Sequence, residues 1–197
     1  MFEKKITKQE INDLPLFKYE GKTIIAATES QIDKAIFEIE EHDVVGFDTE
    51  SKPTFKKGQF NHVALIQIAL QEKVYLLRIN QVGITTTLAR FLSNENIKKI
   101  GIALDDDIIA LKKRRRFLPG GFIDLNKIAP GLGIENIGAR NLSALLLNNR
   151  ISKNQQISNW ENQMLTVPQI KYAATDAWVC LEMYNRLKYW GYLEEAG

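Results

Sequence analysis

Two carboxylates end an apolar run at residues 44–50, which read VVGFDTE. The β-branched and aromatic residues of this run predict a buried strand. Side chains alternate across a strand, so Asp48 and Glu50 should share one face, roughly 6–7 Å apart along it. Two carboxylates on one face suit a hard divalent cation. A solvated strand end would show the same pattern, so a functional site requires further partners.

A hydroxyl and a third carboxylate are expected together on a later helix. Thr166, followed three residues later by Gln169, matches a capping box and predicts a helix start. On that helix Tyr172 and Asp176 are separated by four residues and therefore lie on the same face. An ordinary amphipathic helix, with Tyr172 half buried and Asp176 exposed, is the alternative reading of this pair.

Three consecutive aspartates, Asp105, Asp106 and Asp107, follow the apolar run at 100–104. Carboxylates at a helix start accept hydrogen bonds from free N–H groups and complement the helix dipole. At most one of the three is therefore needed for catalysis. Asp107 precedes Leu111 by one turn, on the stripe expected to face the sheet, and we expect Asp105 and Asp106 to cap the helix.

Hydrophobic periodicity predicts the elements that must position these residues. Thr7 with Glu10 indicates a short capped helix, and Ser30 with Asp33 is expected to open a helix reaching about residue 41. The segments 17–19 and 23–27 flank a Glu-Gly turn and predict a hairpin. Strands are expected near 44–49, 63–70, 74–79, 98–103 and 121–124, and helices near 85–93, around Asp107 and after Thr166.

This order of elements predicts an α/β fold with a mixed sheet flanked by helices. At 197 residues, 45% hydrophobic and 25% charged, the chain can bury one core, so we expect a single domain over residues 1–197, with 1–16 as an N-terminal extension. The single cysteine, Cys180, excludes an internal disulfide and favours a cytoplasmic location. No run approaches a transmembrane length, and His42 and His62 lack zinc-ligand spacing, so neither a membrane nor zinc is expected.

The motifs combine into a family pattern. Asp-x-Glu at 48–50, Gly-Ile-x-x-x-x-Asp at 101–107 and Tyr-x-x-x-Asp at 172–176 resemble the three exonuclease motifs of the DEDD superfamily of 3′-5′ exonucleases, in the subgroup with tyrosine. The branch similar to ribonuclease D and the Werner syndrome exonuclease domain resembles the chain most. The resemblance runs from about residue 17 to 190, and several coincident motifs in the right order make it specific.

The resemblance implies a fold, an activity and a role for each residue. It implies a ribonuclease H-like fold and hydrolysis of phosphodiester bonds from the 3′ end of DNA or RNA, releasing nucleoside monophosphates. Two divalent cations, Mg²⁺ or Mn²⁺, would be bridged by Asp48. Glu50 and Asp176 would complete the first ion's shell, Asp107 would hold the second ion through water, and Tyr172 would orient the attacking water. This two-metal arrangement suits in-line displacement at phosphorus.

Nucleic-acid binding is also suggested by clustered basic residues. The formal charge of +2 is too small to indicate it alone. A basic run follows Asp107 closely, and a solvated helix face is its alternative meaning. The loop after Glu50 adds Lys52, Lys56 and Lys57. The basic run consists of Lys112, Lys113, Arg114, Arg115 and Arg116. Its candidate phosphate ligands are Lys112, Arg114, Arg115 and Arg116.

Contacts to bases are less strongly indicated. Leu65 and Gln67 lie in a stretch shared with the family and are possible contacts to the terminal nucleotide. Phe55, Phe60 and Trp160 are aromatic candidates for stacking on bases, although core packing is favoured for Trp160.

Two other functions use the same motifs. One is a non-catalytic nucleic-acid-binding module of the same fold, which the four retained acids disfavour. The other is a phosphodiesterase for very short oligonucleotides, which only a substrate-length series would distinguish. The sequence indicates no particular protein partner.

Overall fold

The structure is a computed structural model that describes residues 3–54 and 60–193. Its centre is a mixed sheet of six strands in the order β1-β4-β3-β2-β5-β6. The strands are β1 Lys22–Ala26, β2 Val44–Ser51, β3 Val63–Ala69, β4 Lys73–Leu77, β5 Lys98–Gly101 and β6 Phe122–Asp124. The helices are α1 Lys8–Asp13, α2 Glu29–Ile39, α3 Ile79–Val82, α4 Thr86–Ser93, α5 Leu104–Arg114, α6 Leu125–Ile128, the 3₁₀ helix η1 Ala129–Leu132, α7 Ala139–Leu147 and α8 Val167–Tyr189.

Strands β2, β3 and β4 form an antiparallel meander, as their short connections predict. The remaining pairs, β1 with β4, β2 with β5 and β5 with β6, are parallel. Strand β3 lies in the middle and is buried along its whole length. The predicted mixed sheet flanked by helices is therefore confirmed.

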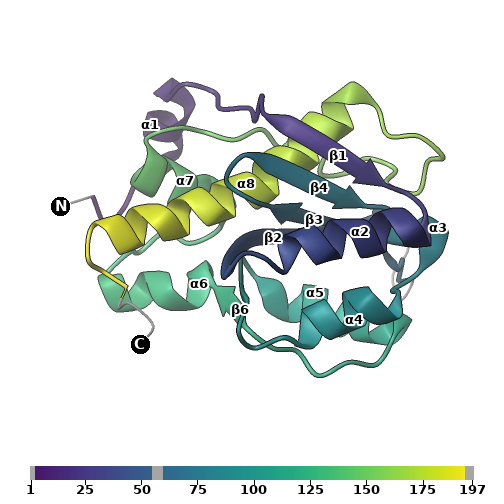
Figure 1. Ribbon diagram of the computed structural model, residues 1–197. Coiled ribbons are helices and arrows are strands. Elements are labelled where there is room, and N and C mark those ends of the chain that lie inside the picture. The colour runs from purple at the N-terminus through teal and green to yellow at the C-terminus, as the bar shows by residue number, and fades with distance from the viewer. Residues whose placement is uncertain (1–2, 55–59, 194–197) are drawn as a thin grey trace.

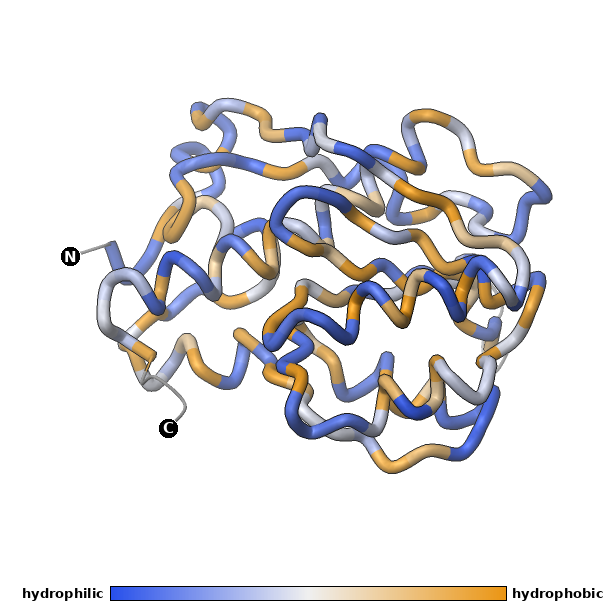
Figure 2. Tube along the Cα trace, viewed as in Figure 1, coloured by the Kyte–Doolittle hydropathy of each residue, from blue (hydrophilic) through white to orange (hydrophobic). Residues whose placement is uncertain are grey.

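Helices cover both faces of the sheet (Figure 1). Residues of α2, α4 and α5 pack on one face against β2, β3 and β4. Helix α8 lies along the other face and contacts β2, β3, β4 and β5, with α7 beside it. Each helix turns apolar residues inward, and Figure 2 shows this as alternating blue and orange along α2. Within the described residues no helix is long and apolar enough to cross a bilayer.

The predicted N-terminal hairpin is wrong. Residues 17–19 form no strand, and β1 pairs with β4 instead. Phe17 stacks on Trp178 of α8 at a ring distance of 5.0 Å, and the Tyr19 N–H donates to the Thr175 hydroxyl oxygen at 3.0 Å. These contacts attach the segment before β1 to α8 rather than to a neighbouring strand.

Of the three helix caps predicted at a serine or threonine, two are present. Thr7 with Glu10 and Thr166 with Gln169 both form reciprocal capping boxes. The expected cap at Ser30 is wrong, because α2 begins at Glu29 and Thr28 caps it with Gln31. Asp33 instead accepts a hydrogen bond from the Thr85 hydroxyl at 3.0 Å.

Candidate active site

Three predicted carboxylates meet where β2 passes under α8. Asp48 and Glu50 lie on β2 and Asp176 lies on α8, and one carboxylate oxygen of each is within 4.8 Å of the others. Gly46 makes this approach possible, because a Cβ there would lie 2.1 Å from the Ala177 carbonyl oxygen. The strand pattern and the helical spacing thus place three acids, separated by up to 128 positions in the chain, in one cluster.

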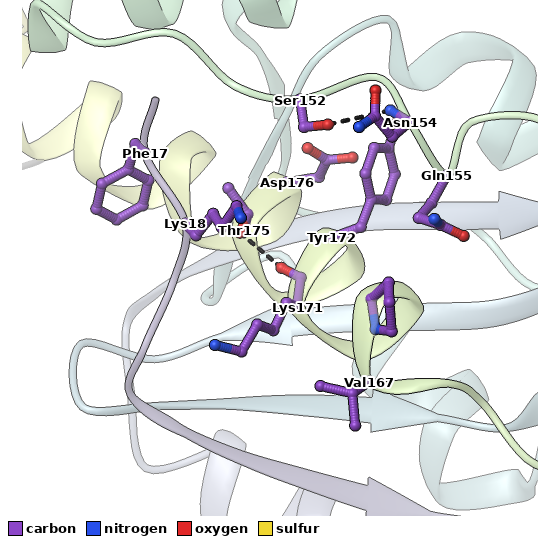
Figure 3. A pocket seen from close by; sticks show the side chains of 11 residues that line it. Phe17, Lys18, Ser152, Asn154, Gln155, Val167, Lys171, Tyr172, Thr175 and Asp176 are labelled. Carbon is purple, nitrogen blue, oxygen red and sulfur yellow. Dashed lines mark hydrogen bonds between the residues drawn. The ribbon is translucent and has the colours of Figure 1, made fainter. Parts of the chain in front are cut away.

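Tyr172 lies one turn before Asp176 on α8. Figure 3 shows both side chains on the same side of the helix, facing the segment that carries Ser152 and Asn154. The Trp160 ring packs 6.0 Å from the Tyr172 ring. The start of the helix is also fixed, since the Gln169 amide donates to the Ser158 hydroxyl at 2.8 Å. Packing and capping together hold the tyrosine in place.

Asp107 approaches the cluster from the other side of β2. The Thr49 hydroxyl donates a hydrogen bond of 2.6 Å to the Asp107 carboxylate. Asp107 is not one of the three acids within 4.8 Å, so it lies beside this group rather than inside it. This placement is compatible with a ligand for a second ion.

Helix α5, which carries Asp107, is capped by a residue that the sequence did not indicate. The Asp124 carboxylate accepts the N–H groups of Ala103 and Leu104 at 3.0 and 3.1 Å. The predicted capping role of Asp105 and Asp106 is therefore wrong, and Asp105 forms an exposed ion pair with Lys127 at 2.7 Å. Ala103 has a left-handed backbone, which turns the first N–H groups of α5 toward β6. The one available signal was the position of Asp124 at the end of an apolar strand.

Burial raises the pKa of all four carboxyl groups. It raises the pKa of Asp48 well above its usual range, and the nearby charges of Asp176 and Asp107 add to this effect. Burial and the charge of Asp48 raise the pKa of Glu50 to about 10. Burial raises the pKa of Asp107 to about 6 despite the Thr49 hydrogen bond. It raises the pKa of Asp176 to about 7 against a hydrogen bond from Tyr172. The site therefore resists carrying four negative charges.

This electrostatic situation fits cation binding. Throughout residues 3–54 and 60–193, no ion pair joins a lysine or arginine to any of the four carboxylates. Carboxylate oxygens are the ligands that hard divalent cations prefer. The donor set thus fits a hard divalent cation, whose charge would offset that of the carboxylates.

The Tyr172 hydroxyl keeps its proton at neutral pH. Burial raises the pKa of Tyr172, and the charges of Asp176, Glu50 and Asp48 raise it further. The phenol is therefore available as a hydrogen-bond donor beside the carboxylates rather than as a base.

Leu65 and Gln67 lie on β3 directly opposite the site strand. Leu65 pairs with Glu50 and Gln67 pairs with Asp48, so their side chains point to the same face. Both are fully buried, and the Gln67 amide has no hydrogen-bond partner in the described part of the chain. Their expected contact with the terminal nucleotide stays a prediction.

The basic run ends α5, and its members differ in their surroundings. Arg114 donates to the Ile79 carbonyl oxygen at 3.1 Å, and Arg115 donates to the Ile84 carbonyl oxygen at 2.8 Å. Lys112 and Arg116 are exposed. Arg114 and Arg115 thus anchor the end of α5, and the binding of phosphate by the run stays a prediction.

The aromatic residues proposed to stack on bases differ in their burial. Trp160 is fully buried, which confirms the expected core packing. Phe60 is 79% exposed, with the Lys113 ammonium 4.7 Å from its ring centre. Phe55, Lys56 and Lys57 lie outside the described residues.

Two cavities flank Tyr172 and Asp176. One has a volume of about 330 Å³ and lies between the segment before β1, the segment around Asn154 and the start of α8 (Figure 3). The other, of about 450 Å³, lies between α1, the start of α7 and residues 151–156. Both are within the size range of small-ligand sites. No motif in the sequence indicated residues 151–156 as part of the cleft.

Comparison with known proteins identifies the family. The family model described as 3′-5′ exonuclease matches residues 23–189. The bifunctional 3′-5′ exonuclease/ATP-dependent helicase WRN of Mus musculus is 30% identical over 186 residues, which cover 89% of this chain and 13% of that protein. The chain thus spans only a small part of this relative's length.

Solved structures share the fold. The EXO domain of Nibbler from Aedes aegypti has a TM-score of 0.79 at 22% identity, over 88% of this chain and 93% of that one. RNase D of Escherichia coli has a TM-score of 0.75 at 20% identity, over 89% and 47%. These likenesses confirm the predicted ribonuclease H-like fold. Because the family model matches residues 23–189, most of its length, the chain belongs to the 3′-5′ exonuclease family.

Proposed function

We propose that this chain hydrolyses the phosphodiester bond nearest the 3′ end of DNA or RNA and releases a nucleoside monophosphate. The observation that supports this most is the cluster of Asp48, Glu50 and Asp176, with carboxylate oxygens within 4.8 Å of one another and Asp107 beside them. A module that only binds nucleic acid would not require four partly buried carboxylates that form no ion pair with any lysine or arginine in the described part of the chain. The activity is proposed for the single domain formed by the described residues.

Each carboxylate has a distinct place in the proposed site. Asp48, Glu50 and Asp176 would hold a first divalent cation. Asp48 would also contribute to a second cation site, which Asp107 would complete through water. When bound, Mg²⁺ or Mn²⁺ ions stabilise charge on the entering and leaving oxygens of an in-line displacement at phosphorus.

The chain's own residues position the other reacting groups. Tyr172, protonated and held against Trp160, would donate to or align the attacking water above the carboxylates. The Thr49 hydroxyl fixes the orientation of the Asp107 carboxylate. The terminal nucleotide would lie beside β2 and β3, where Leu65 and Gln67 are opposite the catalytic acids.

The test is digestion of 5′-labelled single-stranded and recessed-end DNA and RNA in the presence of Mg²⁺ or Mn²⁺. We expect products shortened one nucleotide at a time from the 3′ end. Asp48→Asn should abolish turnover while the protein stays folded, because the bridging charge is removed. Asp43→Asn, an exposed acid in the turn before β2, is the matched control and should remain active.

Degradation by Asp48→Asn, or by the unmodified protein in excess EDTA, would disprove the metal-dependent mechanism. A series of substrate lengths separates this function from its closest alternative. Turnover confined to the shortest oligonucleotides would favour the phosphodiesterase, and tight binding without turnover would favour the non-catalytic module.

A further inference from the structure

The larger cavity beside the active site is lined by cations. Lys8, Arg140 and Lys153 line it together with Tyr172 and Asp176 of the catalytic cluster. Lys8 and Lys153 are exposed, and Arg140 is half-buried. Among the described residues that line this cavity, Asp176 is the one acid. Away from the catalytic carboxylates, the wall is therefore positive.

Lys8 reaches the cavity because the N-terminal arm, residues 3–16, is docked on the domain. Ile11 is buried, with 2% of its surface exposed. The Arg150 guanidinium donates to the Leu14 carbonyl oxygen at 3.0 Å, and the Ile6 N–H donates to the Asn136 side chain at 2.9 Å. Figure 1 shows α1 of this arm next to α7. The arm thus forms a fixed wall of the cleft.

The arm also positions a second cation. The Arg140 guanidinium donates to the Asn12 side-chain oxygen of α1. Its Nε is buried and has no hydrogen-bond partner in the described structure. The residue as a whole is half-buried and lines the cavity, so its guanidinium can bind a phosphate oxygen that enters there.

The geometry of the reaction determines which phosphates could lie here. A nuclease that releases one nucleoside monophosphate from a 3′ end cleaves at the last phosphodiester, so every other internal phosphate of the strand lies on its 5′ side. Cations placed next to the catalytic cluster, but not among its carboxylates, are therefore positioned for these upstream phosphates. Such cations bind through charge and carry no sequence information.

We infer that the N-terminal arm forms one wall of the substrate channel, and that Lys8, Arg140 and Lys153 bind the phosphates of the strand upstream of the scissile bond. The inference rests on the proposed exonuclease function and extends it. The family model begins at residue 23, so Lys8 and Asn12 lie outside the matched segment. By binding these upstream phosphates, the wall that the arm forms would favour longer strands over dinucleotides.

The first test measures binding and does not depend on turnover. Affinity for a long single-stranded oligonucleotide is measured against salt concentration in EDTA, for the full chain and for a Lys8→Gln, Arg140→Gln, Lys153→Gln variant. The salt slope should fall by roughly 0.7 for each phosphate that the variant no longer binds. Lys34→Gln, an exposed lysine on α2, is the control and should leave the slope unchanged. An unaltered slope in the triple variant would overturn the inference.

The second test separates substrate binding from general damage. A dinucleotide contains the scissile phosphate and no upstream one, so the ratio of kcat/KM for the long strand to that for the dinucleotide should fall in the triple variant. Equal losses on both substrates would contradict the assignment. If the unmodified protein cleaves neither substrate, the proposed function fails, whereas the salt slopes still decide this inference.

A third variant tests how the arm positions Arg140. Asn12→Ala should reduce the salt slope, and adding it to Arg140→Gln should cause no further change, because both act on the binding of one phosphate. Additive effects, or no effect of Asn12→Ala, would show that the tether to α1 is not needed for binding.

Discussion

At the scale of single residues, Tyr172 differs from the acids around it because it does not need to lose a proton. Burial and, after it, the neighbouring carboxylates raise the pKa of its hydroxyl, which therefore remains a donor. A group that positions the attacking water contributes less to the reaction rate than the groups that bind the metal ions, because those ions activate the water. The residue should consequently affect the rate of the chemical step more than the assembly of the site.

Tyr172→Phe should lower kcat by roughly 10²–10⁴-fold, the usual range for acid–base or positioning groups. The ring that packs against Trp160 is retained, so the fold and the metal affinity should change little. Single-turnover kinetics together with Mn²⁺ titration will check both expectations. An unaltered kcat under conditions where chemistry limits the rate would remove Tyr172 from the mechanism.

Residue spacing made part of this site predictable. Asp48 with Glu50, and Tyr172 with Asp176, have separations that fix a shared face once the strand and the helix are recognised. Asp124 could not be found in this way, because its partners at Ala103 and Leu104 are backbone N–H groups about 20 residues away in the chain. Long-range side-chain to backbone contacts leave no periodic signal in the sequence.

At the scale of elements, the start of α5 depends on Asp124. Asp124→Ala should lower the free energy of unfolding by about 1–2 kcal/mol, because the N–H groups of Ala103, Leu104 and Asn126 lose their acceptor. Urea denaturation measures this change. Asp124→Ala should also reduce turnover, since α5 carries Asp107.

The neighbouring aspartates are the matched controls for this helix start. Asp106→Ala should change the free energy of unfolding by no more than about 0.5 kcal/mol, as is usual for exposed positions. Asp105→Ala loses only its exposed ion pair with Lys127, worth about 1 kcal/mol or less. A larger loss of stability at Asp105 or Asp106 than at Asp124 would show that the cap has been misassigned.

The other end of α5 separates anchoring residues from candidate substrate ligands. Arg114→Gln should lower the free energy of unfolding by about 1–2 kcal/mol, because its charged hydrogen bond to the Ile79 carbonyl is removed. Arg116→Gln and Lys112→Gln, at exposed positions, should leave stability unchanged. If these two bind phosphate, each should lower the salt slope of single-strand binding by roughly 0.7. Unchanged slopes would identify the basic run as a solvated helix end.

Local sequence signals predicted most helices and strands, but they failed where a contact with a distant residue determines the local structure. The capping boxes at Thr7 and Thr166 are complete within four residues, so the sequence reveals them. The segment before β1 has the composition of a strand, yet Phe17 and Tyr19 pack on α8. Asp33 has the spacing of a cap, yet it binds Thr85. Tertiary contacts determined both outcomes.

At the scale of the whole molecule, the site joins both faces and one end of the sheet. Strand β2 supplies two acids, α8 brings Asp176 across one face, and α5 brings Asp107 from the end of β5. The sheet order, with β2 between β3 and β5, makes this possible. Four acids drawn together in this way store electrostatic repulsion in the folded state, and this cost must depend on pH.

Without metal, the protein should lose stability as pH rises. The pKa of Asp107 is raised to about 6 and that of Asp176 to about 7, so the folded protein binds more protons than the unfolded chain above about pH 4. The free energy of unfolding therefore falls as pH rises through these values, and it continues to fall toward about 10, where Glu50 titrates. Calorimetry in EDTA across this range measures the decline.

Added Mg²⁺ should reverse this dependence, because cations replace the protons that the carboxyl groups release. The increase in Tm caused by Mg²⁺ should be larger at about pH 8 than at about pH 5, where Asp107 and Asp176 are mostly protonated. Glu50→Gln removes one titrating group and should flatten the decline in EDTA while weakening the effect of Mg²⁺. Equal Mg²⁺-induced increases in Tm at the two pH values would show that the acidic cluster does not couple proton release to metal binding.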